Sequence, residues 1–96
     1  MKNSGKKKYK VIYHKLVEDD VSKIDRNSVR KIYEAITNRL VLSPEIYGLP
    51  LHGTLKKYWK FRVRDYRVIY LIENKTILVK VIAHRKDVYE IMSRRI

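Results

Sequence analysis

The final third of the sequence alternates between apolar and other side chains with a period of two, and this pattern constrains the fold most. Apolar residues alternate with basic ones over residues 59–63, and two further apolar runs follow at residues 66–72 and 76–83. The breaks between the runs are two residues long, at Arg64-Asp65 and Asn74-Lys75. A period of two is typical of β-strands, and two-residue breaks are typical of hairpins. The sequence therefore predicts an antiparallel meander of three strands.

Upstream of this meander the apolar residues follow a helical period. A short β-type run at residues 9–14 comes first, and apolar side chains then recur at helical spacing over residues 16–24 and 29–40. The break between these two segments, residues 25–28, offers several candidate N-caps. Two helices joined by so short a break are typical of an αα-hairpin.

The remaining segments complete the expected order of elements. Residues 45–53 hold Pro50 and two of the three glycines, which favours a loop, and residues 86–96 fit a short terminal helix. The expected fold class is α+β: an N-terminal strand, an αα-hairpin, the antiparallel three-strand meander (β-α-α-β-β-β) and a short C-terminal helix, with the helices on one sheet face. We expect a single domain over residues 1–96, with residues 1–8 as a flexible basic arm.

The charge is the most unusual feature of the composition. The chain carries 23 Lys and Arg against 10 Asp and Glu, a formal net charge of +13. Such an excess favours polyanionic partners: nucleic acid, an anionic membrane or an acidic protein. The absence of cysteine excludes disulfides, thiolate zinc sites and cysteine nucleophiles. No apolar run has the length of a membrane span or of a signal peptide, so the expected location is the cytoplasm.

The short turns predict which residues of neighbouring strands lie opposite each other. The first turn places Arg62 opposite Arg67, and the second places Ile82 on the other side of Arg67. At the strand end, His84 is then expected opposite Asp65. The helices are expected to cover an apolar face that collects Trp59, Phe61, Val63, Tyr66, Val68, Tyr70, Ile72, Ile77, Val79, Val81 and Ala83. The other face collects Lys60, Arg62, Arg64, Arg67, Lys80 and His84, with Ile69, Leu71, Leu78 and Ile82 beneath them.

This cationic face is the candidate functional feature. A like-charge pair such as Arg62 and Arg67 destabilises a sheet, and Asp65 is the only acid expected nearby. A fold keeps such a cluster most easily where an anion binds; the alternative is a solvated strand face of a basic protein. The planar guanidinium group of Arg binds phosphate through two parallel hydrogen bonds, and Lys adds a point charge. The cluster therefore suits a phosphate-containing substrate.

One reaction fits these residue types without a metal. RNA cleaves itself when its 2′-OH attacks the adjacent phosphate, given a base, an acid and stabilisation of the extra negative charge. The sequence contains no HExxH or paired-carboxylate motif of the usual metal sites. His84 among cations suits a base, and Tyr89 suits base stacking or proton transfer.

The stretch KFRVRDYRVIYLIENKTILVKVIAHRKDVYE, residues 60–90, resembles the RelE/ParE toxin superfamily. Members of this superfamily typically show a basic-x-basic strand, a Tyr-Arg strand and a terminal His-Arg-x-x-Val-Tyr, and the helical pair and the LHGTL segment fit as well. The resemblance implies the toxin of a type II toxin–antitoxin pair. RelE-like members are metal-independent endoribonucleases that cut mRNA in the ribosomal A site by 2′-OH attack.

The resemblance also implies roles for individual residues. It implies phosphate stabilisation by Arg67 and Arg85, and acid/base or charge roles for Lys60 and Arg62. Arg62 stands where Lys is common, and Arg cannot act as a general base, so His84 and Tyr89 are the candidate proton acceptors. The expected catalytic set is Lys60, Arg62, Arg67, His84, Arg85 and Tyr89, and the expected substrate-binding set is Arg64, Lys80 and Lys86.

Two alternatives stay open. ParE-like members share the fold but act on DNA gyrase and usually lack the complete set of basic residues and Tyr. A degenerate member would bind RNA without cleaving it. The expected partners are mRNA, the ribosome with its rRNA and, from the family, a cognate acidic antitoxin. No metal, cofactor or membrane partner is expected.

Overall fold

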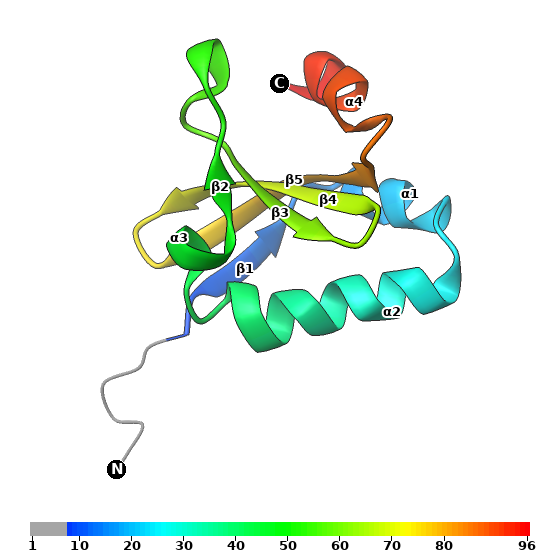
Figure 1. Ribbon diagram of the computed structural model, residues 1–96, viewed down its shortest axis with the longest axis horizontal. Helices are drawn as coiled ribbons and strands as arrows, with labels where there is room; N and C mark the ends of the chain where they lie inside the picture. Colours follow the sequence, from blue (N-terminus) through cyan, green and yellow to red (C-terminus); the bar gives the residue numbers. More distant parts are fainter. Residues whose placement is uncertain (1–7) are drawn as a thin grey trace.

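The structure is a computed structural model that describes residues 8–96, and it contains a five-stranded sheet with helices on both faces (Figure 1). The strand order is β1-β5-β4-β3-β2, in which β1 is parallel to β5 and the other neighbours are antiparallel. The expected basic arm, residues 1–8, falls almost wholly outside the described residues. The elements are β1 (Lys10–Tyr13), α1 (Val17–Ser22), α2 (Arg26–Ala35), a π-helical turn (Ile36–Leu40), α3 (Pro44–Tyr47), β2 (Leu49–Pro50), a 3₁₀ turn (Gly53–Leu55), β3 (Trp59–Val63), β4 (Tyr66–Glu73), β5 (Thr76–His84) and α4 (Val88–Arg95).

The expected α+β class and the order of its main elements are confirmed. Strands β3, β4 and β5 form the predicted meander, and the pairing of β3 with β4 follows the predicted register. The first residue of each turn, Arg64 and Asn74, has a φ of 56°. None of the helices within residues 8–96 has the length and apolar composition needed to cross a bilayer.

The two N-terminal helices begin at favourable residues. The first turn of α1 holds three acids, which the positive end of the helix dipole stabilises. Asp25 caps α2, because its side chain accepts a hydrogen bond from the Ser28 N–H at 2.9 Å. This hydrogen bond lowers the pKa of Asp25. The break predicted at residues 25–28 is therefore confirmed as a helix start.

The segment predicted as a loop, residues 45–53, is more ordered than expected. Pro44 suits the first position of a helix because its φ is fixed near the helical value, and α3 completes one turn from there. Residues 49–50 then pair with β3 as the short edge strand β2. The loop prediction is wrong for these residues, because glycines and prolines punctuate short elements as well as loops.

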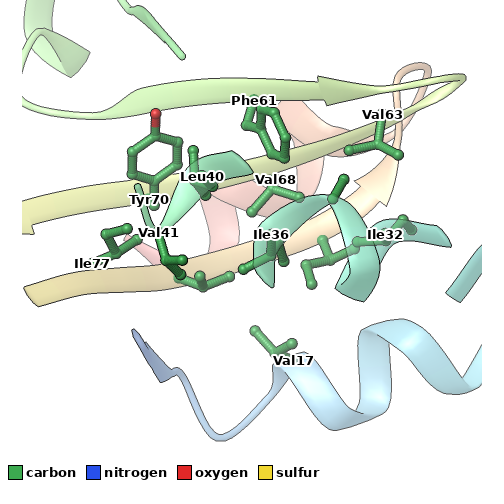
Figure 2. Close-up of a cluster of buried hydrophobic side chains, with 13 residues drawn as sticks. Val17, Ile32, Ile36, Leu40, Val41, Phe61, Val63, Val68, Tyr70 and Ile77 are labelled. Carbon is green, nitrogen blue, oxygen red and sulfur yellow. The ribbon is translucent and has the colours of Figure 1, made fainter. Parts of the chain in front are cut away.

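The sheet divides the apolar core into two clusters. The first lies between the sheet and the helical segment, and Figure 2 shows Ile32 and Ile36 packed toward the side chains of β3 and β4. The second lies under α4, where Val88 and Met92 are almost completely buried. Burial of each such side chain contributes about 2 kcal/mol to stability. The helical pair covers one face, as predicted, and α4 covers the other (Figure 1).

A β-bulge in β5 changes the register predicted for the last strand. Tyr70 lies opposite Val79 and Ile69 lies opposite Val81, so Lys80 faces no residue of β4. Each side chain of β5 beyond this extra residue moves to the other face of the sheet.

The bulge overturns part of the predicted division between the two faces. Val81 and Ala83, predicted to lie under the helical pair, belong to the cluster under α4. Ile82, predicted to lie among the cations, belongs to the cluster under α1 and α2. The prediction was wrong here because it counted residues from the second turn without an insertion.

Candidate functional site

Two arginines lie directly opposite each other on β3 and β4, where the two-residue turn predicts them. Arg62 is exposed and pairs with Arg67, which is partly buried. Desolvation, followed by the positive charges of Arg62 and Arg85, lowers the pKa of Arg67. The cation of Arg67 is therefore less favourable here than in water. An anion bound between these groups would remove that penalty.

Backbone carbonyls of the β3–β4 turn orient the guanidinium of Arg67. Its Nη1 donates hydrogen bonds to the carbonyl oxygens of Arg64 and Tyr66, each at 2.9 Å. Within residues 8–96, Nε and Nη2 of Arg67 make no hydrogen bond. A fixed guanidinium with free donors is suited to bind phosphate.

Asp65 holds Arg85 at the end of β5. The Arg85 N–H donates to the Asp65 carbonyl at 2.7 Å, and Nε of Arg85 lies 3.6 Å from Oδ1 of Asp65. Both side chains are more than half exposed, so the ion pair contributes only about 0–1 kcal/mol to stability. Its main effect is to place a third guanidinium close enough to Arg67 to lower the pKa of that residue.

Lys60 and Tyr89 lie at a groove beside the arginines. The groove has a volume of about 520 Å³ and is lined by Lys60 of β3, Tyr89 of α4, residues 49–52 and Leu55. Tyr89 is 46% exposed, and it also acts on the pKa of Arg67. The structure therefore brings together Lys60, Arg62, Arg67, Arg85 and Tyr89 of the expected catalytic set.

His84 does not join this group, and its predicted place on the cationic face is wrong. The bulge puts His84 opposite Tyr66 instead of Asp65, while Arg67 lies opposite Ala83 instead of Ile82. The rings of His84 and Tyr66 meet edge to face, with centroids 5.5 Å apart. Nδ1 of His84 accepts a hydrogen bond from the Lys86 N–H at 3.1 Å. His84 therefore lies on the opposite sheet face from Arg67.

The three residues expected to bind substrate lie in different places. Arg64 is exposed in the β3–β4 turn, and Lys86 is exposed between β5 and α4. Lys80 lies at the bulge, where its charge, after desolvation, lowers the pKa of His14 at the end of β1. Lys80 is therefore separated from the arginines of β3 and β4. Residues 8–96 hold no group of three or more His, Cys, Asp or Glu side chains placed to bind a metal ion.

Sequence reasoning missed the second wall of the groove. Residues 49–52 and Leu55 form this wall, although His52 is a loop residue without a partner in the sequence pattern. The available signal was the run LPLHGTL, in which four apolar residues surround Gly53. Gly53 has a φ of 65°, which suits the turn that sets the wall in place.

The fold is that of the toxins of toxin–antitoxin systems. The chain is similar to one in the RelBE2 toxin–antitoxin complex of Mycobacterium tuberculosis, with a TM-score of 0.78 and 23% identity over 82% of this chain and 100% of that one. For the archaeal RelE–RelB complex of Pyrococcus horikoshii the values are 0.63, 26%, 82% and 97%. For YafQ of E. coli they are 0.60, 18%, 84% and 98%. No curated protein matches the chain by sequence.

The sequence model of one family matches most of the chain. This family is described as the ParE toxin of the type II toxin–antitoxin system parDE, and the match spans residues 11–89. The chain therefore belongs to the ParE toxin family, within the RelE/ParE superfamily, and is a toxin of a type II toxin–antitoxin system. This confirms the resemblance found in the sequence.

Proposed function

We propose that this toxin is an endoribonuclease that cleaves mRNA on the ribosome and thereby inhibits translation. The observation that carries the proposal is the environment of Arg67, which has Arg62 directly opposite, Arg85 nearby and a pKa lowered by desolvation and by these charges. A phosphate group between the arginines would restore the charge balance. The net charge of +13 also suits docking among rRNA phosphates.

The proposed reaction uses the chemistry of RNA itself. The 2′-oxygen attacks the adjacent phosphorus and gives its proton to a base, the bond from phosphorus to the 5′-oxygen breaks, and that oxygen takes a proton. The products are a 2′,3′-cyclic phosphate and a 5′-hydroxyl. Arg67 and Arg85 stabilise the extra charge on the phosphorane, an effect worth about 10²–10³ in rate per donor. Because the RNA supplies the nucleophile and the arginines supply positive charge, the step uses no metal.

The position of His84 narrows the choice of groups for proton transfer. Tyr89 becomes the candidate proton acceptor, and Lys60, in the same groove, becomes the candidate donor to the leaving oxygen. Arg62 keeps its proton and contributes charge. Arg64 and Lys86 flank the cluster and are proposed to contact neighbouring phosphates, whereas Lys80 lies too far toward β1 to be included.

The family match favours one alternative function, because ParE-like toxins act on DNA gyrase. Induced expression distinguishes the two functions when the incorporation of labelled amino acids and of labelled thymidine is followed. An mRNA endonuclease stops amino-acid incorporation first, and a gyrase inhibitor stops thymidine incorporation first. The complete cluster around Arg67 supports the first outcome.

The site assignment has its own test in the same cells. Arg67→Ala should abolish growth arrest while the protein remains folded, and Arg30→Ala, which removes an exposed arginine of α2 outside the cluster, should remain toxic. A folded Arg67→Ala variant as toxic as the wild type would show that the site is wrong.

We also propose an acidic antitoxin as a partner. The RelBE2 and RelE–RelB structures are complexes of a toxin with its antitoxin. In this chain the cationic face borders the partly exposed Leu71 and Leu78, a combination that fits an acidic amphipathic segment. Co-expression with an adjacent acidic reading frame should suppress toxicity, and the affinity should fall as salt rises. A partner whose affinity is independent of salt would contradict this proposal.

A further inference from the structure

We propose that the groove between α4 and residues 49–55 holds one unstacked base of single-stranded RNA, next to the arginines that hold its phosphate. The inference rests on the proposed function and adds the part of the substrate that the groove binds. Figure 1 shows that the segment between β2 and β3 rises on the same side of the sheet as α4. The groove of about 520 Å³ lies between them.

The two walls of the groove fit the faces of a base. Tyr89 of α4 forms one wall and is 46% exposed, although an unpartnered tyrosine normally buries its ring. Leu49, 64% exposed, and Leu55 contribute to the other wall. Bases stack on aromatic side chains with little regard to sequence, because each base has a π-face. An aromatic wall facing an apolar one therefore suits a flat ring.

The polar groups of the groove fit the edge of a base and the phosphate beside it. Lys60 donates hydrogen bonds, which the carbonyl oxygens and ring nitrogens of bases accept, and His52 both donates and accepts. Lys60 is also two residues from Arg62 on the same face of β3, so the groove continues into the cationic cluster. This continuity favours a nucleotide over an uncharged ligand or an acidic peptide alone.

A base in a duplex cannot enter this groove, because its faces are stacked on its neighbours. The substrate class is therefore single-stranded RNA, with one base turned out of the stack. The base and the phosphate between the arginines then belong to adjacent positions of one strand.

Binding of a trinucleotide RNA with 2′-O-methyl groups tests this inference, because these groups block the attacking oxygen. At low salt, 2-aminopurine at one of the three positions should lose fluorescence on binding, and removal of the base there should weaken binding about tenfold. Leu55→Ala and Tyr89→Ala should abolish both effects. Ile46→Ala, which changes an apolar residue of α3 that is 78% exposed outside the groove, should preserve them.

The outcomes separate this inference from the proposed function. Arg67→Ala should weaken intact and abasic RNA equally and reduce the dependence of affinity on salt. If quenching and the abasic effect persist in folded Leu55→Ala, the base lies elsewhere and the inference is overturned while RNA binding stands. If Leu55→Ala weakens only the binding of an acidic antitoxin, the groove serves that protein and the inference is again overturned. If no RNA binds at low salt, the inference and the RNA chemistry of the site both fail.

Discussion

Asp20 and Arg95 form a buried ion pair that joins the first helix to the last turn of α4. Arg95 donates to both carboxylate oxygens of Asp20, at 2.7 and 2.9 Å, and the two side chains are 9% and 5% exposed. Asp20 also accepts from the Ile82 N–H at 3.1 Å, and Arg95 donates to the Lys80 carbonyl at 2.8 Å. The pair thus satisfies backbone groups beside the bulge and holds α4, which carries Tyr89, against the sheet.

Removal of the Asp20 carboxylate should be strongly destabilising. Asp20→Ala leaves the cation of Arg95 buried without its partner, so the free energy of unfolding should fall by about 3–5 kcal/mol. Urea unfolding measures this loss. Asp19→Ala is the matched control, because Asp19 pairs with Lys23 at 3.5 Å on the exposed surface, and this change should cost less than about 1 kcal/mol. Similar losses for the two variants would contradict the role of the pair.

Removal of Arg62 should separate stability from activity. Arg62→Ala relieves the like-charge pair with Arg67, so the free energy of unfolding should rise by about 0.2–1 kcal/mol. RNA cleavage should decrease, because one phosphate-binding cation is lost. Arg30→Ala on α2 should change neither quantity appreciably. If Arg62→Ala lowers stability and leaves cleavage unchanged, the cluster is structural and does not bind an anion.

Gly48 and Gly53 should respond differently to alanine. A Cβ on Gly48 would overlap the hydroxyl oxygen of Tyr70, which donates to the Pro44 carbonyl at 2.7 Å in the core. Gly48→Ala should therefore cost about 2 kcal/mol or more of the free energy of unfolding. Gly53 has open space around it and a φ of 65°, so Gly53→Ala should cost about 1 kcal/mol. Chemical denaturation of both variants tests the order, and the reverse order would contradict it.

The cap of α2 should give a pH-dependent contribution to stability. The hydrogen bond from Ser28 lowers the pKa of Asp25 below its usual 3.8, so the ionised cap stabilises the fold above that pH. This contribution is lost as the pH falls through the lowered pKa of the folded state. The difference in melting temperature between wild type and Asp25→Ala should therefore be present near pH 7 and shrink toward pH ~2. Asp25→Asn keeps a capping oxygen without the charge and should show a weaker pH dependence. A difference independent of pH would contradict the prediction.

The pairing of Arg62 with Arg67 was predictable because both residues flank a two-residue turn, which fixes the register locally. The place of His84 was not predictable in this way. The extra residue at Lys80 is stabilised by Asp20 and Arg95, which lie far from it in the sequence, and no local pattern contains this information. The arginine cluster was therefore predicted correctly, whereas the proton acceptor assigned to β5 was misplaced.

The groove depended on contacts of a kind that the sequence pattern does not contain. Its two walls, Tyr89 and residues 49–55, are brought together by β2 pairing with β3 and by α4 packing on the sheet. The helical period of residues 86–96 predicted α4 but not which face of the sheet it covers. That choice follows from the burial of Val88 and Met92 against Ile69 and its neighbours.

The most direct test of the central claim is cleavage of a defined mRNA on purified ribosomes, with one 2′-deoxy nucleotide placed at the mapped cut. Wild-type toxin and Arg30→Ala should produce a fragment with a 5′-hydroxyl from the unmodified mRNA and none from the 2′-deoxy mRNA. Folded Arg67→Ala should cut neither. Cleavage of the 2′-deoxy mRNA, or cleavage by Arg67→Ala at the wild-type rate, would contradict the account.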